Sequence, residues 1–209
     1  ADINERHVNR IFLPGVPLDN GVRAISDLRA VALADVVLLV VPAQHLRSVA
    51  AELGRHLSID KPVVICAKGI EQSSGKLMGE VAGEVIPQAL LAVLSGPSFA
   101  ADVVRGLPAA LTLACRAESG GRALSAALSS RQMRLYWSSD VIGAELGGAV
   151  KNVLAIGAGI VAGRELGASA HAALVTRGFA EMRRFAEAYG ARPETLMGLS
   201  GLGDLILTC

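Results

Sequence analysis

Aromatic residues and cysteines are scarce in this 209-residue chain, and it has no excess of charge of one sign; each of these features argues against a class of protein. Aromatic residues make up only 3%, too few for the stacking platforms on which single-stranded nucleic acids bind. Twenty basic and 19 acidic residues are interspersed without a basic stripe, so nucleic acid is not an expected partner. The cysteines Cys66, Cys115 and Cys209 lie far apart with no C-x-x-C pattern. Such a set gives no zinc site and is typical of a reducing cytoplasm.

Long hydrophobic runs are also missing, although 52% of the residues are hydrophobic and the mean hydropathy is +0.46. The longest uninterrupted apolar run covers residues 36–43, far short of the roughly 20 residues that a membrane-spanning helix needs. The run after Lys151 is longer, but it is rich in glycine and ends at Arg164. We therefore expect a soluble, cytoplasmic protein without a transmembrane segment.

The first residues, ADINER, do not have the pattern of a secretory signal peptide. The chain also opens without methionine, which leaves open that the sequence is a piece of a longer gene product.

Apolar runs and helical patterns alternate along the first two thirds of the chain. Continuous runs rich in Val, Ile and Leu are typical of strands that are buried on both faces of a parallel sheet. Strands are expected at 34–42, 61–69, 90–94, 111–114 and 133–137, with helices at 43–57, 77–85 and 121–129. This order predicts an α/β fold with a Rossmann-like, doubly wound parallel sheet.

The pattern changes near Ile142. Strand-like runs stop there, and small residues at helical spacing predict two long, closely packed helices at 148–161 and 170–189. We therefore expect a dinucleotide-binding domain over residues 1–142 and an all-helical, substrate-binding domain over residues 143–209.

Polar residues follow three of the predicted strands at their carboxyl ends, where ligands bind in open α/β sheets. They lie at 42–45, at Lys68 and Gly69, and at 96–98. The last turn offers backbone N–H groups and the hydroxyl of Ser98 to an anion, unless Ser98 only caps a helix. Lys68 is either a solvated lysine at a strand end or a ligand contact.

Lys151 and Asn152 stand at the front of the apolar run GGAVKNVLAIGAG, residues 147–159. A buried ammonium group is costly unless it is paired or used. Asp204, in the segment GLSGLGDLILTC, can neutralise Lys151; if the run after it is helical, Thr208 shares its face. The alternative is that Asp204 only favours a helix N-terminus. A partly desolvated lysine exchanges protons near neutral pH, and Asn152 can hold a hydroxyl or an amide.

These two segments join four others, FLPGVPL (12–18), LLVVP (38–42), KGIE (68–71) and SGPSFA (95–100). Together they resemble the bacterial-type NAD(P)-dependent glycerol-3-phosphate dehydrogenases along essentially the whole chain. The resemblance implies reversible hydride transfer between NAD or NADP and dihydroxyacetone phosphate, which supplies sn-glycerol 3-phosphate for phospholipid synthesis. It also implies a small-molecule phosphate substrate, no metal and a homodimer.

The resemblance further implies roles for individual residues. Lys151 matches the family's catalytic lysine, which exchanges a proton with the C2 oxygen of the substrate. Asp204 matches the aspartate that pairs with the lysines and binds substrate, and Lys68 matches a contact to both substrate and cofactor. Lys68 and Asp204 are expected to belong to the catalytic set together with Lys151. The other matched positions are substrate contacts at Gly96, Ser98, Asn152 and Thr208, and cofactor contacts at Pro42 and Ala100.

The chain departs from the family pattern in three places. The family's glycine-rich cofactor turn would precede residue 1, and its Ser-Arg-Asn element would follow Cys209, so both domains are expected to be incomplete here. Ser169 stands where the family usually has asparagine. The residue that separates NADH from NADPH would also lie upstream. Two alternatives remain: a ketopantoate reductase-like dehydrogenase, and a non-catalytic fragment or interaction module.

Overall fold

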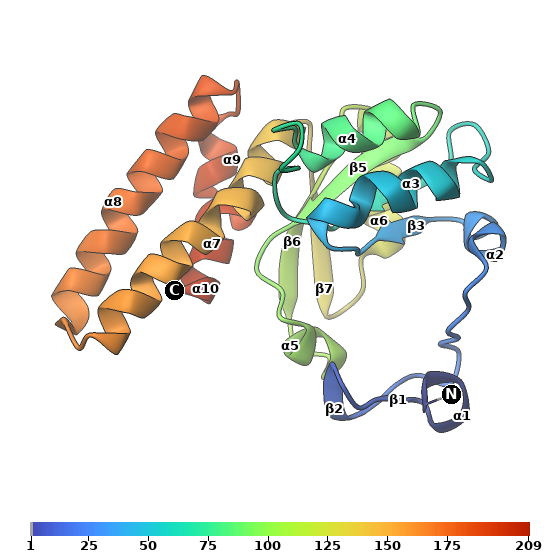
Figure 1. Cartoon of the computed structure of the whole chain (residues 1–209), viewed down its shortest axis with the longest axis horizontal. Helices are drawn as coiled ribbons and strands as arrows, with labels where there is room; N and C mark the ends of the chain where they lie inside the picture. The colour runs from blue at the N-terminus through green and yellow to red at the C-terminus, as the bar shows by residue number, and fades with distance from the viewer. Residues whose placement is uncertain (1) are drawn as a thin grey trace.

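The computed structural model describes residues 2–209 and places a five-stranded sheet beside a pair of long helices (Figure 1). The strands of the sheet lie in the order of the sequence: β3 (Val37–Leu39), β4 (Pro62–Ile65), β5 (Leu90–Ser95), β6 (Ala109–Ala114) and β7 (Met133–Ser138). One face is covered by α3 (Leu46–Gly54), which follows the short 3-10 turn η1 (Ala43–His45), and by α4 (Met78–Val85). The other face is covered by α6 (Glu118–Leu128).

Burial on both faces of the sheet explains the continuous apolar runs in the sequence. In β4, Val63 and Ile65 pack with α3 and α4, whereas Val64 between them packs into the cluster that includes α6. All three side chains are fully buried. A strand with this environment needs apolar residues at every position rather than at alternate ones. The predicted doubly wound α/β architecture is thus confirmed.

The expectation of an all-parallel sheet is wrong at one pair. The β3–β4, β4–β5 and β6–β7 pairs are parallel, but β5 and β6 run antiparallel, with Val93 opposite Ala114. A parallel pair needs a crossover that carries the chain back along the sheet. The connection here holds only the short helix α5 (Ala100–Val104), which stays beyond the carboxyl end of β5. The chain therefore re-enters the sheet from that end.

Residues 2–33 carry structure that the sequence pattern did not predict. They form α1 (Asp2–Arg6), an antiparallel hairpin of β1 (Val8–Asn9) and β2 (Leu13–Pro17), and α2 (Leu28–Ala32). The hairpin lies apart from the main sheet and approaches α5 (Figure 1). Its strands are too short for an alternating pattern to be recognised.

The second part of the chain is helical, as expected. It consists of α7 (Val141–Gly163), α8 (Gly167–Ala188), α9 (Pro193–Met197), the π-helical turn η2 (Leu199–Gly203) and α10 (Asp204–Thr208). The long helices α7 and α8 pack side by side (Figure 1). A Cβ on Gly178 would lie only 2.4 Å from Cδ2 of Leu154, so the small residue permits this close packing.

Helix α7 begins earlier than predicted because Asp140 caps it. The Asp140 carboxylate accepts a hydrogen bond of 2.9 Å from the backbone N–H of Gly143. The predicted domain boundary at Ile142 thus falls in the first turn of a helix whose early turns pack against β5.

Helix α7 is also long and apolar enough, by length and composition, to cross a membrane. A core helix of a water-soluble protein passes the same test, and α7 contains the buried charged residues Glu145 and Lys151.

Glu145 ties the first half of α7 to α4. Its Oε1 accepts a hydrogen bond of 2.5 Å from the backbone N–H of Gly79, and the residue is only 8% exposed. Desolvation by burial raises the pKa of the Glu145 carboxyl from 4.5 to about 7, partly offset by the hydrogen bond from Gly79. The ionised carboxylate is therefore unfavourable in the folded protein.

We expect Glu145→Gln to become more stable than the parent protein as the pH rises. The raised pKa of Glu145 means that its share of stability is complete below pH 4.5 and is lost as the pH rises through about 7. The amide keeps an acceptor for Gly79 and does not ionise, so the gain should reach up to about 3 kcal/mol above that pH. Unfolding free energies at about pH 5 and about pH 9 measure it. An equal difference at both values would contradict this explanation.

Candidate active site

Two lysines and one aspartate from distant parts of the chain meet at the junction of the sheet and the helices. The Nζ of Lys68, which follows β4, donates to Oδ2 of Asp204 at 2.5 Å. The Nζ of Lys151, from the middle of α7, donates to Oδ1 of the same aspartate at 2.5 Å. Each carboxylate oxygen of Asp204, the first residue of α10, thus pairs with a different ammonium group.

Burial within this cluster is graded. The side chain of Asp204 is 2% exposed, that of Lys151 10% and that of Lys68 27%. Desolvation lowers the pKa of Lys151 below its ordinary value, and the charge of Lys68 adds to this effect, while the bond to Asp204 opposes it. Lys151 therefore holds its proton less tightly than a surface lysine does. The cluster carries two positive charges against one negative charge.

Thr208 completes the surroundings of Lys151. Its hydroxyl donates to the backbone carbonyl of Asp204 at 2.6 Å and accepts a bond of 3.1 Å from Nζ of Lys151. Both residues lie on the short helix α10, so the expected helical run after Asp204 is confirmed. The (i, i+4) spacing places Asp204 and Thr208 on the face that meets α7.

Glycines allow the backbone of η2 to lie directly against α7. A Cβ on Gly147 would be 2.3 Å from the carbonyl oxygen of Ser200 in η2. One on Gly201 would be 2.0 Å from the carbonyl oxygen of Leu196, so η2 lies equally close to α9. A side chain at Gly147 would push η2 and the following Asp204 away from α7 and Lys151, and one at Gly201 would push η2 away from α9. A π-helical turn of this kind is rare and occurs frequently at functional sites.

The stem of Lys68 lies in a similar close contact. A Cβ on Gly148 would approach Cγ of Lys68 to 3.2 Å and the hydroxyl of Ser95 to 3.1 Å. Ser95 ends β5, is fully buried, and its Oγ has no hydrogen-bond partner among residues 2–209. The sequence analysis gave Ser95 no role, although its place at the end of a buried strand was the available signal.

The turn after Ser95 reaches the same junction. Gly96 is buried with φ of +142°, and a Cβ there would lie 3.1 Å from Cα of Leu111, so this conformation suits glycine. A Cβ on Gly203 would lie 3.7 Å from the ring of Pro97, which places the turn beside η2.

Four other predicted site residues do not join the lysine–aspartate cluster. Ser98 is exposed and donates only weakly to Gly96, at 3.4 Å, and the N-cap of α5 is Phe99, so Ser98 does not cap that helix. Asn152 is exposed because one residue along an α-helix turns it about 100° away from Lys151. Pro42 and Ala100 are exposed at the carboxyl ends of β3 and β5.

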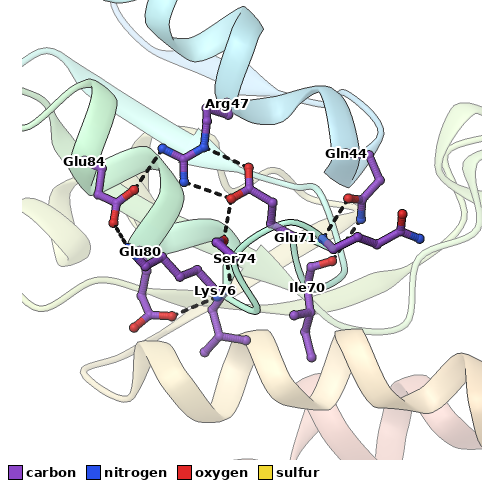
Figure 2. A network of polar contacts seen from close by, with 10 residues as sticks. Gln44, Arg47, Ile70, Glu71, Ser74, Lys76, Glu80 and Glu84 are labelled. Atoms are coloured by element: carbon purple, nitrogen blue, oxygen red, sulfur yellow. Dashed lines mark hydrogen bonds and ion pairs between the residues drawn. The ribbon is translucent and has the colours of Figure 1, made fainter.

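The loop that carries Lys68 is fixed by an ion-pair network (Figure 2). Glu71 accepts two hydrogen bonds from Arg47 on α3, at 2.9 and 2.8 Å, and a third from Ser74 at 2.5 Å. Arg47 also pairs with Glu84 on α4 at 2.8 Å. The Gln44 amide bonds the loop backbone on both sides of Glu71. The sequence analysis missed Glu71, although it lies in the quoted segment KGIE.

We expect Glu71→Gln to be less stable than the parent protein near neutral pH, and we expect most of this difference in unfolding free energy to disappear in acid. The hydrogen bonds from Arg47 lower the pKa of Glu71 from 4.5 to about 2, with Ser74 as the next contribution. The stability that the carboxylate contributes is therefore complete above pH 4.5 and is lost as the pH falls toward about 2. Unfolding free energies of both proteins at about pH 6 and about pH 3 should converge at the lower value.

The exposed pair of Glu118 and Arg122 offers a matched control for that experiment. Both side chains are more than half exposed, and the pair lies within one helix. Glu118→Gln should change stability little at either pH. A constant difference for Glu71→Gln across the same range would contradict the role of its carboxylate.

No metal centre accompanies these residues. Within residues 2–209, no group of three or more His, Cys, Asp or Glu side chains is close enough to hold a metal ion. The three cysteines are free thiols, and desolvation raises the pKa of Cys66 to about 11, so this thiol is not a reactive thiolate. The junction therefore offers a positively charged cluster in which one lysine, Lys151, has a lowered pKa.

Two family models match the chain. The model described as the N-terminus of NAD-dependent glycerol-3-phosphate dehydrogenase matches residues 1–120, and the model of its C-terminus matches residues 140–209. Lys68 lies in the range matched by the N-terminal model, and Lys151 and Asp204 lie in the range matched by the C-terminal model.

Curated relatives carry the same description. The chain is 59% identical over 208 residues to a glycerol-3-phosphate dehydrogenase (NAD(P)+) of Parvibaculum lavamentivorans, covering 100% of this chain and 62% of the relative. It is 56% identical over 209 residues to that of Caulobacter vibrioides, covering 100% and 63%. With the enzyme of Paramagnetospirillum magneticum it shares 60% identity over 207 residues, covering 99% and 75%. The chain thus spans about 62–63% of the length of the first two relatives.

Solved structures agree with this result. The glycerol-3-phosphate dehydrogenase of Coxiella burnetii superposes with a TM-score of 0.94 at 38% identity, covering 100% of this chain and 64% of that one. The enzyme of Saccharomyces cerevisiae gives 0.86 at 29% identity, covering 99% and 63%. With matching models over both parts of the sequence, the chain belongs to the NAD-dependent glycerol-3-phosphate dehydrogenase family.

Proposed function

We propose that the protein is an oxidoreductase that interconverts dihydroxyacetone phosphate and sn-glycerol 3-phosphate with NAD(H) or NADP(H), and so supplies glycerol 3-phosphate for phospholipid synthesis. The observation that carries the proposal is the pairing of Lys68 and Lys151 with one buried aspartate, Asp204. Membership of the family supplies the substrate and the reaction.

The charge of the cluster suits a phosphorylated substrate. Two ammonium groups share a single carboxylate, which leaves an excess positive charge in a largely desolvated place. An anion bound there gains more from electrostatic attraction than it would in water. The more exposed Lys68 is the better placed of the two lysines to meet it from solvent. Gly96 and Ser98, in the turn after β5, are the proposed further contacts.

A nicotinamide cofactor fits the edge of the sheet at which these residues lie. The parallel strands β3, β4 and β5 end there, and the backbone at Gly69 and Gly96 has positive φ and no side chain. A Cβ on Gly69 would lie 3.0 Å from the Cβ of Ala43, so the turns that follow β3 and β4 approach closely. Such an edge, with glycines that permit close approach, is where dinucleotides bind in doubly wound folds. Pro42, Lys68 and Ala100 are the residues that we propose hold the cofactor.

When bound, the cofactor supplies the hydride for the C2 carbon of the substrate. Lys151 holds the proton that the C2 oxygen needs, so that C=O becomes CH–OH with electrons and protons in balance. Its lowered pKa brings its ammonium group closer to the range in which it gives up a proton readily. Asp204 and Thr208 fix the direction of the ammonium group, since both accept from it. Asn152 is proposed as a substrate contact beside it.

Of the two alternatives, a ketopantoate reductase-like enzyme has no support from the family models, which match glycerol-3-phosphate dehydrogenases over both parts of the chain. A non-catalytic role for the chain stays open, because it spans only 62–63% of its first two relatives.

We further propose that the protein is a cytoplasmic homodimer. Three exposed apolar residues on α7 support the dimer: Val153, Ile156 and Ile160. Sedimentation equilibrium tests the dimer.

The direct test is oxidation of reduced nicotinamide cofactor by this chain, with dihydroxyacetone phosphate as the acceptor. We expect turnover that depends on the phosphate group, so dihydroxyacetone alone should react far more slowly. Parallel assays with NADH and NADPH decide the cofactor preference. A folded chain that neither turns over nor binds the cofactor would support the non-catalytic alternative instead.

A further inference from the structure

A cavity outside the lysine–aspartate cluster opens at the other end of the sheet and runs along β5. Its volume is about 650 Å³, within the range of small-molecule binding sites. Asp60 before β4, Leu90 at the start of β5 and Cys115 after β6 line it. Lys68 and Gly96, in contrast, follow the carboxyl ends of β4 and β5. The cavity also reaches Ile65 at the end of β4 and Val93 near the end of β5, but it contains none of the residues of the lysine–aspartate cluster.

The walls of this cavity are mainly apolar. Helix α4 forms one wall, the first turns of α7 form another, and β5 lies between them. Figure 1 shows α4 and the start of α7 on the same side of β5. The apolar side chains that line it are Ile65, Leu77, Leu91, Val93, Val141 and Ile142. Such a surface favours the apolar part of a ligand.

Glu145 is the buried polar group of the cavity. Its Oε1 is bound to the backbone N–H of Gly79, but no donor within residues 2–209 bonds Oε2. The residue is more than nine-tenths buried and lines the cavity. Oε2 is not one of the fully buried polar atoms, so it is open to the cavity and can accept a hydrogen bond from a ligand there.

The other charged groups around the cavity are mostly acidic. Asp60 and Glu80 line it together with Glu145, and Arg116 is the single basic residue of the lining. Tyr189, from the end of α8, and the buried thiol of Cys115 are the remaining titratable groups. Above about pH 7, where Glu145 is ionised, three carboxylates against one guanidinium favour a positively charged ligand over an anion.

We propose that this cavity binds a small amphipathic cation, a primary amine on an apolar body, whose ammonium group donates to Oε2 of Glu145. The apolar body would lie against β5 and the start of α7. The site is independent of the proposed dehydrogenase activity, since none of its lining residues belongs to the lysine–aspartate cluster.

Three probes with one apolar body test the chemistry. We would measure the binding of 4-phenylbutylamine, 4-phenylbutanol and 4-phenylbutyrate to this chain by isothermal titration calorimetry at about pH 8, where Glu145 is mostly ionised. The amine should bind at least about 10-fold more tightly than the alcohol, because a charge-assisted hydrogen bond is worth more than a neutral one. The butyrate should bind more weakly than both.

Two variants locate the site. Glu145→Gln keeps the shape and the bond from Gly79, so it should fold and lose the preference for the amine over the alcohol. Gly83→Leu should weaken all three probes, because Gly83 lines the cavity and a Cβ there would meet no atom closer than 3.9 Å. Leucine also favours the helix more than glycine does. Circular dichroism and thermal unfolding verify that both variants are folded.

A direct readout at Glu145 completes the test. An ammonium group beside the carboxylate favours its ionised form, so saturating amine should lower the pKa of Glu145, measured by NMR with labelled glutamate. The alcohol should leave this pKa nearly unchanged. The proposal is overturned if no probe binds, if the preference for the amine survives in Glu145→Gln, or if Gly83→Leu binds the amine as the parent does.

Discussion

Replacing Lys151 with methionine should lower the rate of the proposed dihydroxyacetone phosphate reduction by about 10³-fold, the scale of a lost general acid. Lys151 is the more buried of the two lysines on Asp204, and burial lowers its pKa. The substitution removes the proton donor but keeps a side chain of similar length in the apolar surroundings of α7. Steady-state turnover, with the rate and KM measured separately, gives the size of the effect.

The variant is expected to fold because Asp204 keeps one partner. Lys68 donates to Oδ2 of Asp204 at 2.5 Å, so removing Lys151 does not leave a buried carboxylate without a counterion. Binding of the reduced cofactor should also change little, since we assign its contacts to Pro42, Lys68 and Ala100. A loss of cofactor binding equal to the loss of turnover would contradict the separation of the two roles.

Lys151→Arg distinguishes proton transfer from charge. The guanidinium group keeps the positive charge and can still donate to Asp204, but its pKa is too high for it to give up a proton near neutral pH. We therefore expect Lys151→Arg to retain stability and substrate affinity better than the methionine variant and to remain nearly as slow. Turnover within about 10-fold of the parent in either variant would remove the role given to Lys151.

The sequence predicted the architecture well where burial fixes the residue type. The run of β-branched residues in β4 has no position that faces water, so it reads as a buried strand without further information. The direction of β6 could not be predicted from the sequence, because an apolar strand has the same composition in a parallel and an antiparallel pair. Its direction is set by α5, which is too short to recross the sheet, and no periodic pattern records this.

The candidate site was predictable in its residue types and not in its geometry. Lys151 and Asp204 each stand before an apolar run, so each is expected to need a partner of opposite charge. In the structure, Nζ of Lys151 lies 2.5 Å from Oδ1 of Asp204. What brings them together is the close contact of the backbone of η2 with α7 at Gly147 and with α9 at Gly201, where any Cβ would collide. Sequence periodicity treats these glycines as ordinary small residues. Asn152 shows the converse, since adjacency in sequence turns it away from Lys151 on the helix.

Replacing Asp204 with asparagine should destabilise the protein by about 3 kcal/mol, the cost of removing one partner from a buried ion pair. Two ammonium groups, on Lys68 and Lys151, would then face a neutral amide and each other. Chemical denaturation at neutral pH measures the loss. Asp35→Asn is the matched control, because Asp35 is exposed and its loss should stay within about 0.5 kcal/mol.

The loss in Asp204→Asn should also depend on pH. Asp204 raises the pKa of Lys151 against the effect of burial, so its removal lowers that pKa further below the ordinary value of 10.5. A lysine with a lowered pKa in the folded state costs stability while it is charged, and the cost fades as the pH rises toward 10.5. The difference from the parent should therefore be largest near neutral pH and smaller in alkali. A difference that grows in alkali would contradict the mechanism.

A second substitution tests whether like charge is the cause. Lys68→Met in the Asp204→Asn background removes one of the two ammonium groups that have lost their counterion, so it should restore part of the lost stability. In the parent protein the same Lys68→Met change removes a partner of Asp204 and should destabilise. The effect of Lys68→Met on stability should thus change sign between the two backgrounds. Such a change reports a coupling energy between residues in contact, which a double-mutant cycle measures. If Lys68→Met destabilises both backgrounds equally, the two lysines do not interact through Asp204, and the charge balance proposed for substrate binding fails with it.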